Sequence, residues 1–539
     1  MAGGAEASPS TRSSATVLRD LRRTLREARR RPASDTSYAV YLAILIVVVA
    51  VVPVVRAGWL FVTDPVNAVA LTSAATVPVI AGVVGLVWAA AVMAGRLRGP
   101  VVLTPFLAHA LTTSPVPQRR AFARQAWMSV AALSVVGALC GATVAAASAA
   151  ASAVTDTSAS AGAVASLSTA ALAAASSLST IAPGTALGVA LAASVGAACG
   201  IVAALLWLVG QAVPARWSAL AIGVLVALST VAFGAQVWGV SAGAHHFTAP
   251  GALLAALPLL AALTLLAVVP PLLSRLEPRV VLAQSLRWEA ARLHTSTLEL
   301  SASVATYQSV PRAGRRRLAI GGRARSLPAI IVRRDAIAAL RTPGRLAIGV
   351  LVLLACGALI AGATVVAPPA WMLGAIVGIA AYAAAGPLSD GLRHAVEAAS
   401  ALPLYGTSDS TLLLLHTLFP ALAVGLVVAT GAVLVTLFWP PAGALPLASI
   451  AAAIIVAIGS VVLRLMNALK PPLPLALLTP IPTPAGDAAA LNRVIWALDG
   501  VILAALLGAA VTLTTASVLA PVAVVAVASL IARRRWALR

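Results

Sequence analysis

Long apolar runs that lack Asp, Glu, Lys and Arg alternate with short arginine-bearing segments along most of the chain. The runs at 36–55, 65–95 and 125–155 are examples. Each has about 20 residues or more, which is enough for one helix to cross a hydrocarbon core of roughly 30 Å. The pattern therefore predicts an all-α fold and a polytopic integral membrane protein.

Dividing the apolar runs at their polar breaks predicts about twelve transmembrane helices, with a margin of one or two. The Ala/Ser/Thr-rich stretch 161–180 is a candidate for a further span, although its serines favour an external loop or a surface helix. The expected spans are 38–60, 68–94, 126–150, 184–209, 218–240 and 251–273, then 346–366, 370–388, 411–438, 446–465, 494–515 and 517–532.

Arginines mark alternate loops between these spans. They occur at 96–124 between the second and third spans, at Arg216, in a dense block at 312–345 and at 533–535. The intervening loops carry little charge, so the positive-inside rule places the arginine-bearing loops in the cytoplasm. We therefore expect a multi-pass protein of the plasma (inner) membrane whose N- and C-termini are both cytoplasmic.

A short motif precedes the first span of each predicted half. In both copies an Asp is followed five residues later by a Leu-Arg pair: Asp20 before Leu25-Arg26, and Asp335 before Leu340-Arg341. The surrounding apolar positions favour a helix in the membrane interface, and a solvated basic helix is the alternative. The expected organisation is a basic N-terminal segment (1–37), a first six-helix half (38–274), a basic linker with an interfacial helix (275–345) and a second six-helix half (346–539).

The loops after the second span of each half also correspond in position. The first runs from Leu103 to Arg120 and the second from Leu392 to Ser408, and both contain prolines that stop one helix before the next begins. This order of elements resembles the permease subunit of an ATP-binding-cassette exporter, with two halves fused in one chain as in high-GC actinobacteria. The resemblance implies a separate ATPase subunit that docks on these loops. It points to Leu111, Ser114, Pro115, Pro117, Arg119, Arg120, Leu402 and Pro403.

Composition agrees with the membrane prediction, because 61% of the residues are hydrophobic and 10% are charged. The net charge of +22 lies in loops between apolar runs, so we assign it to topology and to anionic membrane lipids rather than to nucleic acid. Lys470 is the only lysine and stands in no GxxxxGK[ST] motif. We expect no catalytic site of the chain's own, no cofactor and no metal, and ATP hydrolysis only in a partner.

Two polar residues within the predicted spans are candidates for a transport pathway. Asp499 is the only acidic residue that falls inside a predicted span, and Gln236 is a side-chain amide near the external end of another. The scarcity of carboxylates disfavours an ion-coupled secondary transporter. A non-transporting scaffold or degenerate permease stays open as an alternative, and the exported substrate is undefined.

Overall fold

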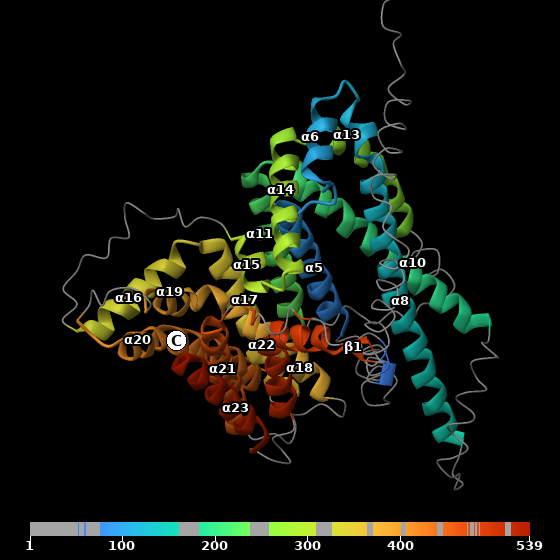
Figure 1. The fold of residues 1–539 in the computed structure, drawn as a ribbon. Helices are drawn as coiled ribbons and strands as arrows, with labels where there is room; N and C mark the ends of the chain where they lie inside the picture. The colour runs from blue at the N-terminus through green and yellow to red at the C-terminus, as the bar shows by residue number, and fades with distance from the viewer. Residues whose placement is uncertain are drawn as a thin grey trace, which may run out of the picture. The chain divides into compact units, whose positions relative to one another are not determined.

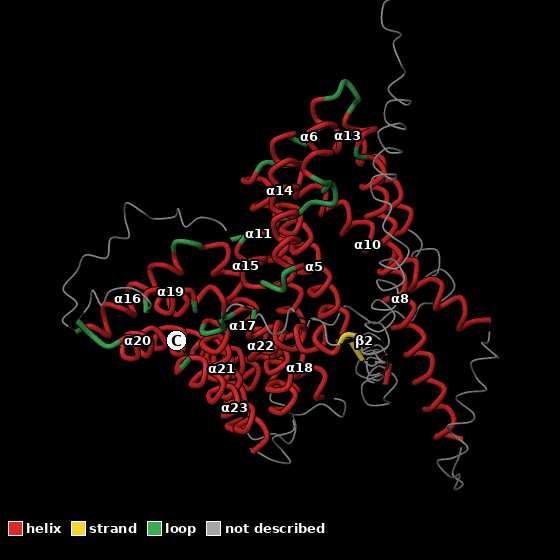
Figure 2. The backbone as a smooth tube through the Cα atoms, viewed as in Figure 1, coloured by secondary structure: helices red, strands yellow, loops and turns green. Residues whose placement is uncertain are grey.

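The structure of the 539-residue chain is a computed structural model. Figure 2 shows that its described part is almost entirely helical, joined by short loops. The strands in this part are two residues long: β1 (Pro482–Thr483) pairs antiparallel with β2 (Gly486–Asp487). Apart from a few isolated positions, the structure describes residues 76–160, 183–237, 258–308, 326–363, 370–399, 406–438, 446–471, 486–512 and 519–538.

Nine helices in the described ranges are long and apolar enough to cross a membrane. They coincide with nine of the twelve predicted spans, and the all-helical membrane fold is confirmed to that extent. Their outward faces are apolar: Leu422, Leu426 and Val231 are each more than 60% exposed. Such faces suit a lipid environment, where helices satisfy their own backbone groups and need no polar surface.

The three other predicted spans do not correspond to any of these nine helices. The first, 38–60, lies almost wholly outside the described residues, as does the alternative span 161–180. The sixth corresponds to a broken element, Pro258–Ser274 followed by Pro278–Ser296 at an angle of 93°. The twelfth is helix α23 (Leu519–Ala537), whose last two turns carry Arg533, Arg534 and Arg535. Its uncharged part of 14 residues is about 21 Å long, shorter than the hydrocarbon core.

The chain divides into two compact units, 1–290 and 291–539. In unit 1 four long helices lie side by side in the order α11, α5, α10, α8, with α10 packed between α5 and α8 (Figure 1). The elements of unit 1 are α5 (Thr76–Leu97), α6 (Pro105–Thr113), α7 (Gln118–Ala121), α8 (Ala123–Ser160), α10 (Pro183–Ala212), α11 (Ala215–Val237), η2 (Leu266–Val268), α13 (Val269–Ser274) and most of α14 (Pro278–Ser296).

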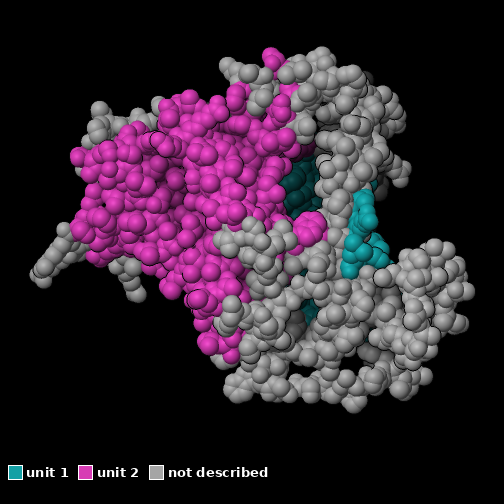
Figure 3. Space-filling view, turned by 90° about the horizontal axis from the view of Figure 1, so that it is seen from below, with its two compact units in different colours: residues 1–290 teal, residues 291–539 magenta. Residues whose placement is uncertain are grey.

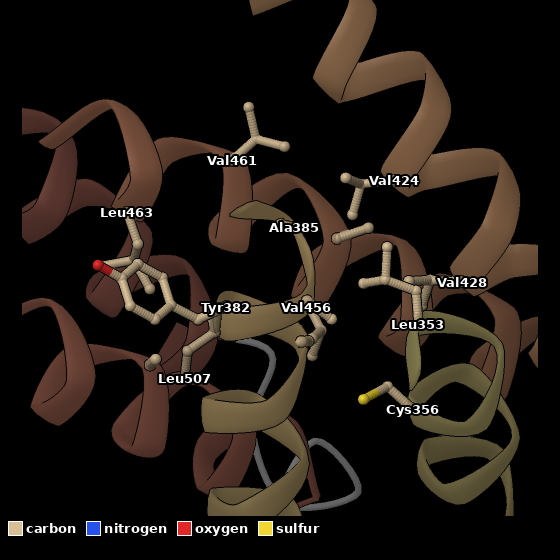
Figure 4. Close-up of a cluster of buried hydrophobic side chains, with 14 of the residues drawn as sticks. Leu353, Cys356, Tyr382, Ala385, Val424, Val428, Val456, Val461, Leu463 and Leu507 are labelled. Atoms are coloured by element: carbon tan, nitrogen blue, oxygen red, sulfur yellow. The ribbon is translucent and has the colours of Figure 1, made fainter. Parts of the chain in front are cut away.

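Unit 2 is closely packed and is drawn in magenta in Figure 3. Helix α18 packs mainly against α22, α17 packs against α20, and α21 lies between α20 and the α22–α23 pair. Tyr382, Val428, Val456 and Leu507 point into its apolar core (Figure 4). Besides α23, its elements are α15 (Leu300–Ala305), α16 (Leu327–Leu340), α17 (Pro343–Ala363), α18 (Ala370–Ala384), η3 (Gly386–Leu388), α19 (Asp390–Ala398), α20 (Asp409–Phe438), α21 (Pro446–Ala468) and α22 (Ala488–Thr512).

The segment predicted as an interfacial helix of the second half is α16. It packs against α19 and α20, and its buried residues are Ile331, Asp335, Ile337 and Ala339. The repeated aspartate therefore faces protein in this copy. The matching segment around Asp20 lies outside the described residues.

Candidate functional site

The turn between α6 and α7 contains most of the candidate residues of the first loop. Ser114 follows α6 in an extended conformation, and its Oγ donates to the carbonyl of Leu111 over 3.0 Å. The carbonyl of Pro117 accepts from the backbone N–H of Arg120 over 2.8 Å and starts the short helix α7. Proline at 117 suits this position because a helix start needs no N–H there. The turn is thus held by its own hydrogen bonds.

The inner side of this turn belongs to the apolar core of unit 1. Leu111, Val116 and Ala121 are buried, and Phe122 is fully buried immediately before α8 begins. They join a cluster that includes Leu272 and other residues of α13 and α14. A displacement of the turn would therefore be transmitted to the base of α8, because close-packed residues move together.

The outer side of the turn is polar and solvent-facing. Pro115, Pro117, Arg119 and Arg120 are all exposed. The sequence between α5 and α8 contains no acidic residue that could neutralise these arginines. A partner with an acidic surface would be attracted to this side of unit 1.

A groove of about 640 Å³ adjoins the exposed Arg119. One wall is formed by Pro117, Gln118 and Arg119 of the turn. The other is formed by Pro270, Pro271 and Ser274 of α13, whose opposite face is buried through Leu272 and Leu273. Because prolines have few conformations to lose, the groove presents a stiff apolar wall beside a positive charge.

Two buried glutamines fix the chain at the entry to this loop. Gln211 of α10 donates through Nε2 to Oε1 of Gln284 of α14 over 2.8 Å, and both are at most 4% exposed. The amide of Gly99 donates to the same Oε1, and Gln284 Nε2 donates to the carbonyl of Gly95 at the end of α5. Gln211 also exchanges two hydrogen bonds with the backbone of Val101. The side chain of Gln284 thus supplies a donor to carbonyls at the end of α5, which have no partner within the helix.

The second predicted loop is described only in part. Leu402 and Pro403 lie outside the described residues. The preceding helix α19 buries Leu392, Ala395 and Val396. Its first residue, Asp390, pairs with Arg345 of α17 over 2.5 and 3.2 Å.

Asp499 lies in a three-residue ion cluster that joins α22 to its neighbours. Its Oδ1 accepts from Lys470 Nζ over 2.9 Å, and its Oδ2 accepts from Arg535. Lys470 also donates to the carbonyls of Trp496 and Ala497. Burial lowers the pKa of Lys470, and the hydrogen bond that Lys470 donates to Asp499 opposes that shift. The arrangement links the end of α21 and the end of α23 to the middle of α22, and this contact engages the only acidic residue within a predicted span.

Gln236 lies in the last turn of α11, and its side chain is outside the described part of the structure. Polar residues that the sequence reasoning did not select are Arg464 in α21, Gln211 in α10, and His416 in α20, which is buried against Asp335 of the repeated motif. Each stands in or beside an apolar run, and a polar residue in such a run is the signal that could have found them. Gln211 was missed because the predicted span ended at 209, whereas α10 ends at Ala212.

The described residues contain no cluster of His, Cys, Asp and Glu that could hold a metal ion. Comparison with family models, with curated proteins and with solved structures yields no match for this chain.

Proposed function

We propose that the chain is the membrane-spanning permease component of an ATP-driven exporter, and that a separate ATPase subunit docks on the α6–α7 turn and the adjoining groove. One observation carries the proposal: the turn is buried on its inner side in the core of unit 1 and exposed on its outer side. Pro115, Pro117, Arg119 and Arg120 form the contact surface. Phe122 connects that surface to α8.

The mechanism follows from this connection. The partner binds ATP and changes shape, and the rigid turn passes that movement to α8 and the helices packed against it. A ligand can shift a conformational equilibrium only by its differential affinity for the two states. In this proposal the nucleotide-bound partner supplies that difference, and alternating access moves the substrate across the membrane.

The charge distribution of unit 2 supports a cytoplasmic position for the arginine-bearing ends. Residues 346–389, 410–463 and 500–532 contain no Asp, Glu, Lys or Arg. The charged residues beside these stretches lie at the start of α17 and α20, in α19, which follows α18, in the first half of α22, and near the end of α21 and α23. If these helices alternate across the membrane, all of this charge lies at one surface, which the positive-inside rule assigns to the cytoplasm.

We also propose that the two units descend from one repeated half. Helices α6 and α19 both have nine residues and follow the end of a long helix. Helix α5 packs against α11 in unit 1, and α18 packs against α22 in unit 2. These pairs occupy the same places in the expected order of spans.

The engagement of Asp499 with two cations argues against ion-coupled transport, because a coupling carboxylate must be able to exchange its partner for an ion. The scaffold alternative shares the membrane architecture but requires no ATP-dependent movement. The experiment must therefore test both the partner and its activity.

The test compares the full chain with a double variant, Arg119→Glu with Arg120→Glu, after mild-detergent purification from native membranes. The matched control is Arg216→Glu, which reverses an exposed arginine at the start of α11. We expect an ATP-binding-cassette ATPase to co-purify with the unchanged chain and the control, and its amount to fall at least about tenfold in the double variant. Equal partner recovery from all three chains would overturn the docking assignment. A partner without ATP-stimulated transport in vesicles would favour the scaffold.

A further inference from the structure

Two arginines from different helices of unit 2 converge beside Gly386. A Cβ atom built on Gly386 would lie 3.1 Å from Nη2 of Arg464 and 3.6 Å from Nη2 of Arg345. Arg464 comes from α21 and Arg345 from the first turn of α17. The absence of a side chain at 386 leaves room for both guanidinium groups at one point.

The positive charge at this point exceeds the negative charge around it. Arg345 is paired with Asp390, whereas Arg464 donates only to the carbonyls of Tyr382 and Ala383, over 2.7 and 2.8 Å. Its guanidinium group lies 4.2 Å from the centroid of the Tyr382 ring. No hydrogen bond occupies the Nη1 group of Arg464 in the described part of the chain. Two cations and one carboxylate leave a net charge of one, at a cost that a bound anion would relieve.

The two arginines are partly exposed. Ala383 is exposed, and the side chains of Arg345 and Asp390 are 26% and 44% exposed. Arg464 lies within the last two turns of the apolar part of α21, which ends at Ala468. Long basic side chains near the end of a membrane helix reach the headgroup region.

We propose that Arg345 and Arg464 form a binding site for a phosphate group at this end of unit 2. The guanidinium fork matches the geometry of phosphate oxygens and binds them by charge-assisted hydrogen bonds. The phosphate belongs either to the headgroup of an anionic phospholipid or to inorganic phosphate from solution. Asp390 competes with it for Arg345. This site is independent of the proposed exporter function, because it requires neither a partner nor transport.

The test measures thermal unfolding of the full chain in detergent as three probes are titrated: phosphatidylglycerol, diacylglycerol with the same acyl chains, and inorganic phosphate. A ligand that binds only the folded state raises the melting temperature in proportion to its affinity. The variants are Arg345→Gln, Arg464→Gln and Asp390→Asn. The control is Arg393→Gln, which removes an arginine of α19 that pairs with Glu397 over 3.6 Å on the exposed face.

We expect phosphatidylglycerol to protect the chain and diacylglycerol to have no comparable effect. Arg345→Gln and Arg464→Gln should raise the half-effective lipid concentration roughly tenfold, the loss of one charge-assisted pair. Asp390→Asn should lower it, because Arg345 is then released. Equal protection by inorganic phosphate identifies solution phosphate as the ligand, and protection by the lipid alone identifies the headgroup.

The proposal is overturned if no phosphate probe protects the unchanged chain, or if the three arginine variants respond alike. Arg464→Gln also removes the hydrogen bonds to Tyr382 and Ala383, so this variant alone could fail to fold. The opposite signs expected for Arg345→Gln and Asp390→Asn then decide the matter, because a loss of folding cannot make one variant bind more weakly and the other more tightly.

Discussion

Nδ1 of His416 lies 2.7 Å from Oδ2 of Asp335, and the two side chains are 2% and 4% exposed. The contact joins α16 to α20. The carbonyl of His416 has no helical donor, because the residue four positions on is Pro420. The pair is thus placed where α20 is locally weakened, and it ties that turn to the helix that precedes the first span of unit 2.

Breaking this pair from one side should strongly destabilise unit 2. Asp335→Ala or His416→Ala leaves a buried polar group without its partner, at an expected cost of about 3–5 kcal/mol. The double variant should cost less than the sum, because neither orphan remains. Thermal melting of the purified chain measures all three. The exposed pair of His294 and Glu299, 3.2 Å apart, is the control. Glu299→Ala should change the free energy of unfolding by less than about 1 kcal/mol, and a similar loss in both pairs would refute the structural role of the buried one.

Gly391 should tolerate no larger residue, because α19 passes close to the buried aspartate. A Cβ at this position would lie 2.4 Å from Cγ of Asp335. Gly391→Ala should therefore lower the melting temperature and displace Asp335 from His416. Gly425→Ala in α20 is the matched control, since a Cβ there would meet nothing within 4 Å. It should be neutral or slightly stabilising, as alanine favours helices. Equal effects would mean that α19 has room to shift.

The sequence predicted nine spans that the structure contains, because hydropathy is summed over about 20 residues and single positions matter little. The fourth span was expected at 184–209 and is found in α10 at Pro183–Ala212. The pairing of Gln211 with Gln284, 73 residues apart, could not be predicted. The spacing of residues along the chain does not indicate which helices contact one another, because those contacts are set by tertiary packing. For the same reason Ser114 and Pro117 could be recognised as turn residues, whereas the groove facing α13 could not.

The ion cluster of Asp499 can be tested through the chemistry of Lys470, the only lysine of the chain. Asp499 raises the pKa of Lys470 against the lowering effect of burial. Asp499→Asn removes this support, so the pKa should fall and the neutral, reactive amine should be more abundant at a given pH. Labelling by an amine-acylating reagent, followed on the Lys470 peptide by mass spectrometry, should be roughly 3–10-fold faster between pH 8 and 9.

A control separates this effect from simple exposure of the lysine. Glu397 is an exposed carboxylate of the same unit and pairs with Arg393 over 3.6 Å, so Glu397→Gln should leave the labelling rate unchanged. In Asp499→Asn the midpoint of the labelling profile should move to lower pH. A higher rate at every pH with an unchanged midpoint would show that the substitution opens the structure, and the ion cluster would then lack the proposed effect on the lysine.

Helices α8 and α10 should depend on glycines where their backbones meet. A Cβ on Gly196 would lie 2.1 Å from the carbonyl oxygen of Gly137, and one on Gly137 would lie 2.1 Å from that of Gly196. Membrane helices without a hydrophobic drive between them rely on such close approach. Gly196→Ala must push the helices apart, and we expect a loss of about 1–3 kcal/mol, measured by thermal melting. Gly188→Ala in the same helix meets nothing within 4 Å and should be neutral. If Gly196→Ala and Gly188→Ala change the melting temperature equally, helix propensity rather than contact with α8 determines the effect of alanine in α10. The close packing of α8 on α10 would then be refuted.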